Sequence, residues 1–281
     1  MITTSEIAPS PALVPFIRHY AYRQFDTNGA DITMPWRASQ DTNIIFFFKD
    51  VPASLTDQNT GEVLKRGKNC DIVGMSTKYN GCMTFNGKYS FLQIIFQPHG
   101  FYTLFNASPV EIADKIVWSG DIFNSDIKLL HEQLSEAISF VDMAELANNW
   151  LLRYLTKKKR INYKDRITIT ANLITKNAGL INLDTLAEYA CMSMRNFERI
   201  FISETGMSPK QLCCISRFNN ALELKLKDPS MEWTSIAHLS GYFDQMHLVK
   251  DFKRFCGEAP SALLKHVPLL EENYISRISN R

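Results

Sequence analysis

Short apolar runs separated by turn residues occupy the chain from about residue 32 to residue 105. β-Branched and aromatic side chains crowd these runs, as they do in buried or half-buried strands. The clearest runs are NIIFFF (43–48), CDIVGM (70–75), GCMTF (81–85) and SFLQIIFQ (90–97), with Asn86-Gly87 as a tight turn between the last two. Several short strands at this spacing predict a small antiparallel sandwich or barrel.

A helical period replaces this pattern from about Ser108 onward. Between Ser125 and Leu155, apolar residues recur at three- and four-residue spacing, which predicts two amphipathic helices. Apolar faces of that length must be buried. Two partners are available, the predicted barrel or a second copy of the chain, and in the second case these helices carry a homodimer contact.

The segment TKKKRINYKD, from Thr156 to Asp165, is polar and basic and has no apolar period. This composition is typical of an interdomain linker. We therefore predict a β-rich first domain over residues 1–156, a linker over 157–164 and a second domain over 165–281. The run Lys157–Arg160 would either bind DNA or remain solvated.

Charge differs between the two halves. Residues 1–156 hold 12 Lys and Arg against 16 Asp and Glu, whereas residues 157–281 hold 19 against 13. An acidic first half and a basic second half indicate that only the second half meets a polyanion, although a solvated basic face would give the same difference.

The sequence LDTLAEYACMSMRNFERIFISETGMSPKQL, which begins at Leu183, predicts a short helix, a tight turn and a second helix that Gly206 ends. Phe197, Ile200 and Phe201 form a buried stripe on the second helix. The expected capping and turn residues are Asp184 for the first helix, Cys191 and Met192 for the turn, and Ser193 for the second helix.

The same layout recurs in WTSIAHLSGYFDQMHLVKDFKRFCGEAPSALL, which begins at Trp233. Its expected parts are Ile236, Ala237 and Leu239 on the inner face of the first helix, Gly241 in the turn, Asp244 as the second cap, and Leu248, Phe252 and Phe255 as the buried stripe. Three pairs of anchors, Phe201 with Phe252, Gly206 with Gly257 and Pro209 with Pro260, are each separated by 51 residues. Two copies in register are far more specific than a single helix-turn-helix pattern.

The stretch GYFDQMHLVKDFKRFCGEAP resembles the C-terminal signature of the AraC/XylS family of transcription regulators. The stretches CMSMRNFERIFISETGMSP and RFNNALELK resemble that family's first motif and connecting helix, so the resemblance covers roughly residues 165–268. The first half is more loosely similar to the family's N-terminal sensor domains. The chain departs from the family pattern at Glu198, Met246 and Lys250.

The resemblance implies an α+β protein of two domains. The first would be a β-barrel or cupin-like domain with helices, and the second an all-α domain of two helix-turn-helix units. A helix from about Pro209 to Leu226 would act as a rigid spacer, so that both second helices enter successive major grooves roughly 34 Å apart. Such a protein is a cytoplasmic, sequence-specific regulator of transcription that binds double-stranded DNA.

Outward-facing residues of the second helix in each unit are candidate base contacts. Arg199 suits guanine, because a guanidinium binds O6 and N7 together. Arg195 would reach a base or a phosphate, and Glu198 would accept from cytosine N4 or hold Arg195. An isolated exposed Arg is usually just solvated, and the repeated motif favours contact here. In the second unit, Gln245 suits adenine through its amide, and His247 and Lys250 would contact a base or a phosphate. The full set is Arg195, Asn196, Glu198 and Arg199 in the first unit and Gln245, Met246, His247 and Lys250 in the second.

Further residues are candidates for phosphate contacts, which give affinity without reading sequence. Free N–H groups at helix N-termini attract anions, and basic side chains at the far end add charge. These candidates are Thr185, Ser193, Thr234, Ser235, Lys253 and Arg254.

Enzymatic chemistry finds little support in the sequence. His19, His99 and His131 are far apart and lack HxH or HxxxE partners, and no GxSxG, Walker or GxGxxG motif occurs. Six cysteines without CxxC pairs predict reduced thiols. We therefore expect no catalytic residue, no metal site, no cofactor and no membrane segment.

Three roles remain open for the first half. It would bind a small-molecule effector, with a pocket drawn from Arg18, His19, Tyr20, Tyr22, Trp36 and Arg37, although such aromatic residues are more often core. It would otherwise only dimerise, in a constitutive DNA-binding scaffold, or carry an enzyme that needs a metal cluster or a thiol of low pKa. RNA polymerase is a further partner if the protein is an activator.

Overall fold

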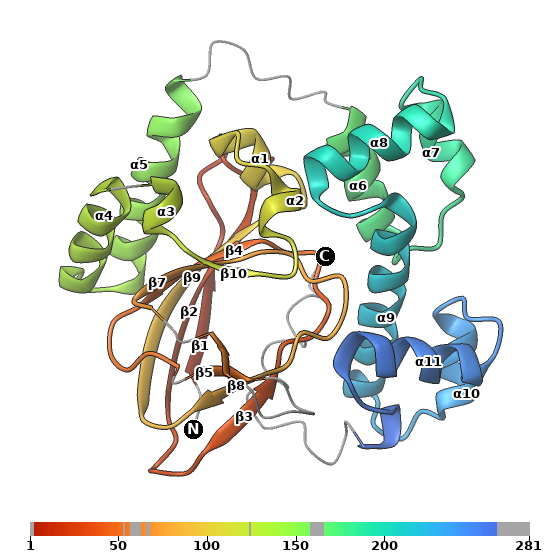
Figure 1. The fold of residues 1–281 in the computed structure, drawn as a ribbon, viewed down its shortest axis with the longest axis horizontal. Helices are drawn as coiled ribbons and strands as arrows, with labels where there is room; N and C mark the ends of the chain where they lie inside the picture. Colours follow the sequence, from red (N-terminus) through yellow and green to blue (C-terminus); the bar gives the residue numbers. More distant parts are fainter. Residues whose placement is uncertain are drawn as a thin grey trace.

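Two antiparallel β-sheets form the N-terminal part of the chain, as a computed structural model of residues 3–52, 54–56, 63–65, 68–123, 125–157 and 166–262 describes (Figure 1). The larger sheet has the strand order β1-β2-β9-β4-β7-β10, and the smaller sheet has the order β3-β8-β5-β6. The strands are β1 (Thr3–Ile7), β2 (Ile17–Asp26), β3 (Ile32–Pro35), β4 (Asn43–Phe47), β5 (Ser54–Thr56), β6 (Val63–Lys65), β7 (Cys70–Val73), β8 (Cys82–Phe85), β9 (Lys88–Phe96) and β10 (Ile116–Trp118).

The four predicted apolar runs correspond to strands β4, β7, β8 and β9. The predicted turn at Asn86-Gly87 does connect β8 to β9, but these strands belong to different sheets. Gly87 has φ +141°, and a side chain there would meet the Asp50 carboxylate. The dipeptide therefore carries the chain from the smaller sheet to the larger one and does not close a hairpin.

Strands β1 and β2 lie before residue 32, where the apolar pattern predicts no strand. Polar residues interrupt β2, and they are held by specific partners. Arg18 forms an ion pair with Asp41 in which Nη2 and Oδ1 are 2.6 Å apart, and the hydroxyl of buried Tyr20 donates to Asn148 Oδ1 at 2.8 Å. Arg18 and Tyr20, two of the six candidate pocket residues, thus have structural roles.

Five helices follow β9 in the N-terminal part: α1 (Gly100–Phe105), α2 (Pro109–Ile112), α3 (Gly120–Phe123), α4 (Ser125–Glu136) and α5 (Phe140–Lys157). The predicted pair of amphipathic helices is confirmed as α4 and α5. Their apolar faces, which include Leu134 and Trp150, share one core with Ile44 and Leu92 of the larger sheet. The sheet therefore buries these faces, and a homodimer stays a prediction.

The C-terminal part consists of helices joined by short turns, without a strand among its described residues. Its elements are α6 (Arg166–Lys176), α7 (Leu183–Tyr189), α8 (Met194–Thr205), α9 (Pro209–Lys227), α10 (Trp233–Leu239) and α11 (Gln245–Cys256). The predicted fold class, a β-barrel or cupin-like part with helices followed by an all-α part, is confirmed, except that the strands form two open sheets and do not close into a barrel. Residues 158–164 of the predicted linker lie outside the described residues. Within the described ranges, no helix has the length and apolar character needed to cross a bilayer.

Candidate nucleic-acid interface

The first helix-turn-helix unit consists of α7 and α8. Asn182, and not Asp184, is the N-cap of α7, because its side-chain oxygen accepts the backbone N–H of Asp184 at 2.7 Å. Both residues are short and polar, so the sequence alone does not separate them. Ser193 precedes α8 and Gly206 ends it with φ +82°, as predicted.

The second unit consists of α10 and α11. Asp244 caps α11 by accepting the backbone N–H of His247 at 2.7 Å, and Gly241 turns the chain with φ +69°, as predicted. Leu239, expected on the inner face of α10, is instead 54% exposed. Ser240 takes the inner place, since it follows Ile236 and Ala237 at helical spacing and is fully buried.

Aromatic side chains bury one face of each second helix, and we call these two helices, α8 and α11, the recognition helices. Phe197 and Phe201 of α8 are fully buried, with ring centroids 5.5 Å apart. Phe252 of α11 packs against Phe218 of α9 and Trp233 of α10, at centroid distances of 4.9 and 5.3 Å. Each recognition helix thereby turns its opposite, polar face outward.

The spacer helix α9 joins the two units without interruption. It begins with a capping box in which Ser208 Oγ accepts the Gln211 N–H at 3.1 Å, while Gln211 Oε1 accepts the Ser208 N–H at 3.2 Å. Its observed span, Pro209–Lys227, is close to the predicted one. Proline at the first helical position suits this start because it has no N–H to leave unpaired.

Arg217 ties the spacer helix to the turn of the second unit. Its guanidinium donates to Gly241 O and to Cys214 Sγ, each at 3.4 Å, and lies 5.4 Å from the ring centroid of Tyr242. Burial raises the pKa of Tyr242, and the Asp251 carboxylate raises it further. These contacts orient α11 relative to α9.

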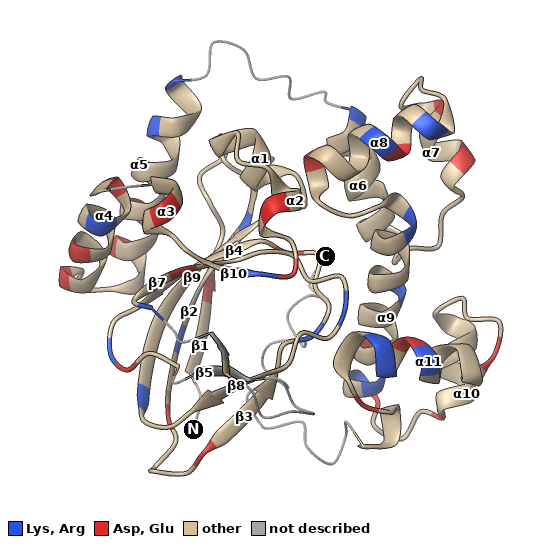
Figure 2. Cartoon of the chain, viewed as in Figure 1, with Lys and Arg blue, Asp and Glu red and all other residues tan. Residues whose placement is uncertain are grey.

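Every predicted DNA-contacting residue is exposed in the structure. In the first unit, Arg199 Nη2 donates to Asn196 Oδ1 at 3.0 Å, which holds the guanidinium along the outer face of α8. Figure 2 shows basic residues on both recognition helices. The exposed set is Thr185, Ser193, Arg195, Asn196, Glu198 and Arg199 in the first unit and Thr234, Ser235, Gln245, Met246, His247, Lys250, Lys253 and Arg254 in the second. Contact of these residues with DNA stays a prediction.

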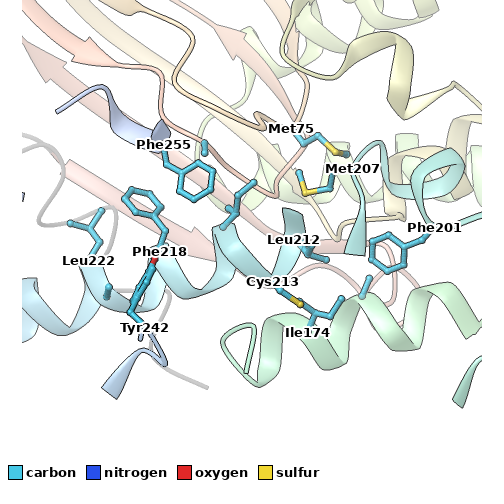
Figure 3. Packing of buried hydrophobic residues seen from close by; sticks show 14 of the residues in the cluster. Met75, Ile174, Phe201, Met207, Leu212, Cys213, Phe218, Leu222, Tyr242 and Phe255 are labelled. Carbon is cyan, nitrogen blue, oxygen red and sulfur yellow. The ribbon is translucent and has the colours of Figure 1, made fainter. Parts of the chain in front are cut away.

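The loop between β7 and β8, residues 74–81, contacts the C-terminal ends of both recognition helices. Met75 is 1% exposed and belongs to the same core as the C-terminal helices (Figure 3). A methyl group at Gly206, which ends α8, would lie 2.9 Å from the Met75 sulfur. The Tyr79 N–H donates to Arg254 O at 3.0 Å, and the Tyr79 ring lies against Gly257, which ends α11.

A second loop, between β3 and β4, extends this contact. The Ala38 N–H donates to Phe255 O at 2.8 Å, and Ser216 Oγ on α9 donates to Gln40 Oε1 at 3.1 Å in a buried position. The N-terminal part is therefore joined to both units and to the helix between them.

The thiols with shifted pKa values are poorly suited to nucleophilic chemistry. Burial raises the pKa of Cys70 to about 12 and that of Cys213 to about 11, and it also raises the pKa of Cys82. A reactive cysteine needs a lowered pKa, because the thiolate is the nucleophile. Over the residues that the structure describes, no three His, Cys, Asp or Glu side chains are grouped to hold a metal.

An exposed residue next to the predicted DNA-contacting residues was not among those predicted. Phe243, between Gly241 and the cap Asp244, is 90% exposed. The sequence does carry a signal for it. The first helices of the two units align at an offset of 50 residues, whereas the recognition helices align at 51, so the second turn is one residue longer.

Two parts of the chain match the models of known protein families. Residues 186–266, which run from α7 past the end of α11, match the model of a helix-turn-helix domain. The chain carries an AraC-type helix-turn-helix domain. The resemblance to the AraC/XylS family is thereby confirmed. Ahead of the AraC-type domain, residues 5–118 match a domain of unknown function (DUF6597), which spans β1 to β10.

Two curated relatives share part of the chain. YidL, an uncharacterized HTH-type transcriptional regulator of Escherichia coli (strain K12), is 28% identical over 163 residues, 54% of this chain and 53% of YidL. An uncharacterized HTH-type transcriptional regulator of Haemophilus influenzae is 38% identical over 88 residues, 31% of this chain and 29% of that protein. The chain therefore spans about half or less of the length of these relatives.

Two solved structures are also similar. ToxT from Vibrio cholerae O395 is 11% identical and matches with a TM-score of 0.49, covering 96% of this chain and 98% of ToxT. The DNA-binding domain of AdpA, solved in complex with a target DNA, is 27% identical and matches with a TM-score of 0.32, covering 35% of this chain and 88% of that domain.

Proposed function

We propose that the protein is a sequence-specific DNA-binding transcriptional regulator of the AraC type, which reads two successive major grooves with α8 and α11. The observation that carries this proposal is the pair of recognition helices, each buried on one face and joined by one continuous helix. The 19 residues of α9 extend about 28 Å at 1.5 Å per residue. That length is comparable to the roughly 34 Å between successive grooves on one side of a duplex.

The exposed residues divide into two kinds of contact. Arg195, Asn196, Glu198 and Arg199 read bases in the first element, and Gln245, Met246, His247 and Lys250 read bases in the second. Thr185, Ser193, Thr234, Ser235, Lys253 and Arg254 contact phosphates and position the protein on the duplex. The Arg199–Asn196 hydrogen bond supports the first assignment, since it pre-orients the guanidinium.

The N-terminal part modulates DNA binding through residues 74–81. This loop contacts the ends of both recognition helices, so a shift of the loop changes how the two units are held. A small-molecule effector in the N-terminal part would act by favouring one arrangement of the loop. A homodimer, and RNA polymerase as a partner of an activator, are further parts of the proposal, and sedimentation of the full chain tests the first.

Footprinting of the purified full chain on genomic DNA tests the proposed function. We expect enrichment of sites with two short conserved elements whose centres are about 10 base pairs apart. A variant with Arg195→Ala and Gln245→Ala is the control and is expected to lose enrichment while keeping its circular dichroism spectrum. Binding that shows no sequence preference for the unmodified chain would contradict a regulator of this kind.

Met75→Asp tests the role of the loop. A carboxylate at this buried position costs several kcal/mol, so the loop is expected to leave the C-terminal ends of both recognition helices. Without the contacts of the loop, only α9 fixes the position of one helix-turn-helix unit relative to the other. The variant should therefore discriminate less than the original chain between the natural site and one with an extra base pair between the elements, in competition binding.

The exposed residue Lys78 supplies the control for Met75→Asp. Lys78→Asp places the same carboxylate in the same loop without opening the core, and its spacing preference should be unchanged. Hydrogen exchange at the Tyr79 amide reports whether the contact has opened. If this amide exchanges freely in Met75→Asp and the spacing preference is intact, the loop does not couple the two units.

A further inference from the structure

The turn of the second unit contains one more residue than the turn of the first. The backbone N–H of Met192 bonds to Ala187 O, and that of Tyr242 bonds to Ala237 O, so Met192 and Tyr242 are equivalent at an offset of 50. The recognition helices begin at Met194 and Gln245, an offset of 51. The extra residue therefore lies between Tyr242 and α11.

Phe243 is this inserted residue. Tyr242 is 7% exposed and packs inward, and Asp244 is the N-cap of α11. Only Phe243 remains between them, and its side chain is 90% exposed. A large aromatic side chain exposed to this extent contributes almost no burial to the fold. The ring is therefore available to contact another molecule.

A second exposed apolar residue stands one turn away. Met246 is 63% exposed, and the ring of His247 lies 6.2 Å from that of Phe243. We call Phe243 and Met246 the apolar edge of the second unit. At the offset of 51, Met246 corresponds to Arg195, so the second unit presents an apolar side chain where the first presents a cation.

The rest of α11 suits a nucleic acid as the occupant of this edge. Lys250, Lys253 and Arg254 are exposed on the same helix and supply positive charge. Residues at the N-terminal end of a recognition helix are the ones that contact base edges. In the major groove, the apolar group displayed by a base is the C5-methyl group of thymine.

We propose that Phe243 and Met246 read thymine methyl groups in the second DNA element. This inference rests on the proposed function, because it requires α11 to enter a major groove. The first unit then selects its element through charged and amide groups, and the second selects thymine through apolar contact. The two elements of one site should accordingly differ in composition, with thymine concentrated in the second.

Replacement of thymidine by deoxyuridine tests this proposal, because their bases, thymine and uracil, differ only in the C5-methyl group. The full chain is titrated with duplexes of its footprinted site in which single thymines of the second element are replaced. At one or two positions, affinity should fall about fourfold, the loss that corresponds to one buried methyl group. Equal affinity for all thymine and deoxyuridine duplexes would overturn the inference while leaving the proposed function intact.

Variants assign the effect to the apolar edge. Phe243→Ser and Met246→Ser should each bind the thymine and deoxyuridine duplexes equally at the position that they read. Leu239→Ser is the matched control, since Leu239 is an exposed apolar residue of α10, and its response to deoxyuridine should be unchanged. If both edge variants keep the full fourfold response, another residue reads the methyl group. If they weaken every duplex alike, the edge contacts the sugar-phosphate backbone, and the proposal is wrong in either case.

Discussion

Arg199→Ala is expected to weaken binding to the cognate site by about 1–3 kcal/mol, the usual contribution of a bidentate contact with guanine. Binding to random DNA should weaken much less, because base recognition is absent there. The ratio of the two affinities should therefore collapse. The variant should stay folded, since the Arg199 side chain is exposed and its removal leaves no cavity.

Lys253→Ala is the control for this prediction. As a phosphate contact, Lys253 should contribute equally to cognate and random DNA, and its loss should lower the salt dependence of binding by about one counterion. Fluorescence anisotropy over a range of salt concentrations measures both quantities. Equal losses on both DNAs for a folded Arg199→Ala protein would make Arg199 a phosphate contact and move base reading to Arg195 and Asn196.

Phe201→Ala is expected to lower the free energy of unfolding by roughly 3–5 kcal/mol. Phe201 is fully buried against Phe197, so truncation removes apolar contact and leaves a cavity that the surrounding helices fill only in part. Loss of this support should also disorder α8. Denaturant titration followed by circular dichroism measures the change in stability.

Ile202 offers a matched control on the same helix. It follows Phe201 directly but is partly exposed, so Ile202→Ala should change the free energy of unfolding by less than about 1 kcal/mol. If the two variants lost similar stability, α8 would not be anchored through Phe201, and the assignment of its buried and outward faces would be wrong.

The C-terminal helices could be predicted from the sequence because their periodicity and caps depend on residues close together in the chain. Phe197 and Phe201 on α8, the end of α8 at Gly206 and the cap at Asp244 lie where the pattern predicts them, because a period of 3.6 residues and the need to satisfy free backbone groups act within a few residues. Ser193 stands at the predicted N-cap position but makes no side-chain capping hydrogen bond, and Ile200 is only partly buried. The outward position of Arg199 follows directly from the inward position of Phe201. Most of the candidate interface could be predicted for this reason.

Only the tertiary structure shows which strands and helices pack against one another. The strands at residues 82–85 and 88–96 are predictable from their composition, yet only the assembled sheets show that they belong to different sheets, because strand pairing joins residues far apart in the chain. The burial of α4 and α5 was similarly open, since an apolar face packs equally well on a sheet or on another copy. The larger sheet covers them here.

The contact between the two parts of the chain was beyond the sequence pattern. Met75 lies in an apolar run that could be buried in the core of either part of the chain. Its contact with Gly206 depends on how the β-rich part packs against the helical part. The exposure of Phe243 was similarly hidden, although the extra residue is countable, because an apolar residue in a turn usually packs inward, as Tyr242 does. The sequence by itself determined the recognition helices and their outward faces. Only the tertiary structure decided what holds their C-terminal ends and which apolar side chain stays in solvent, since both depend on contacts between residues distant in the chain.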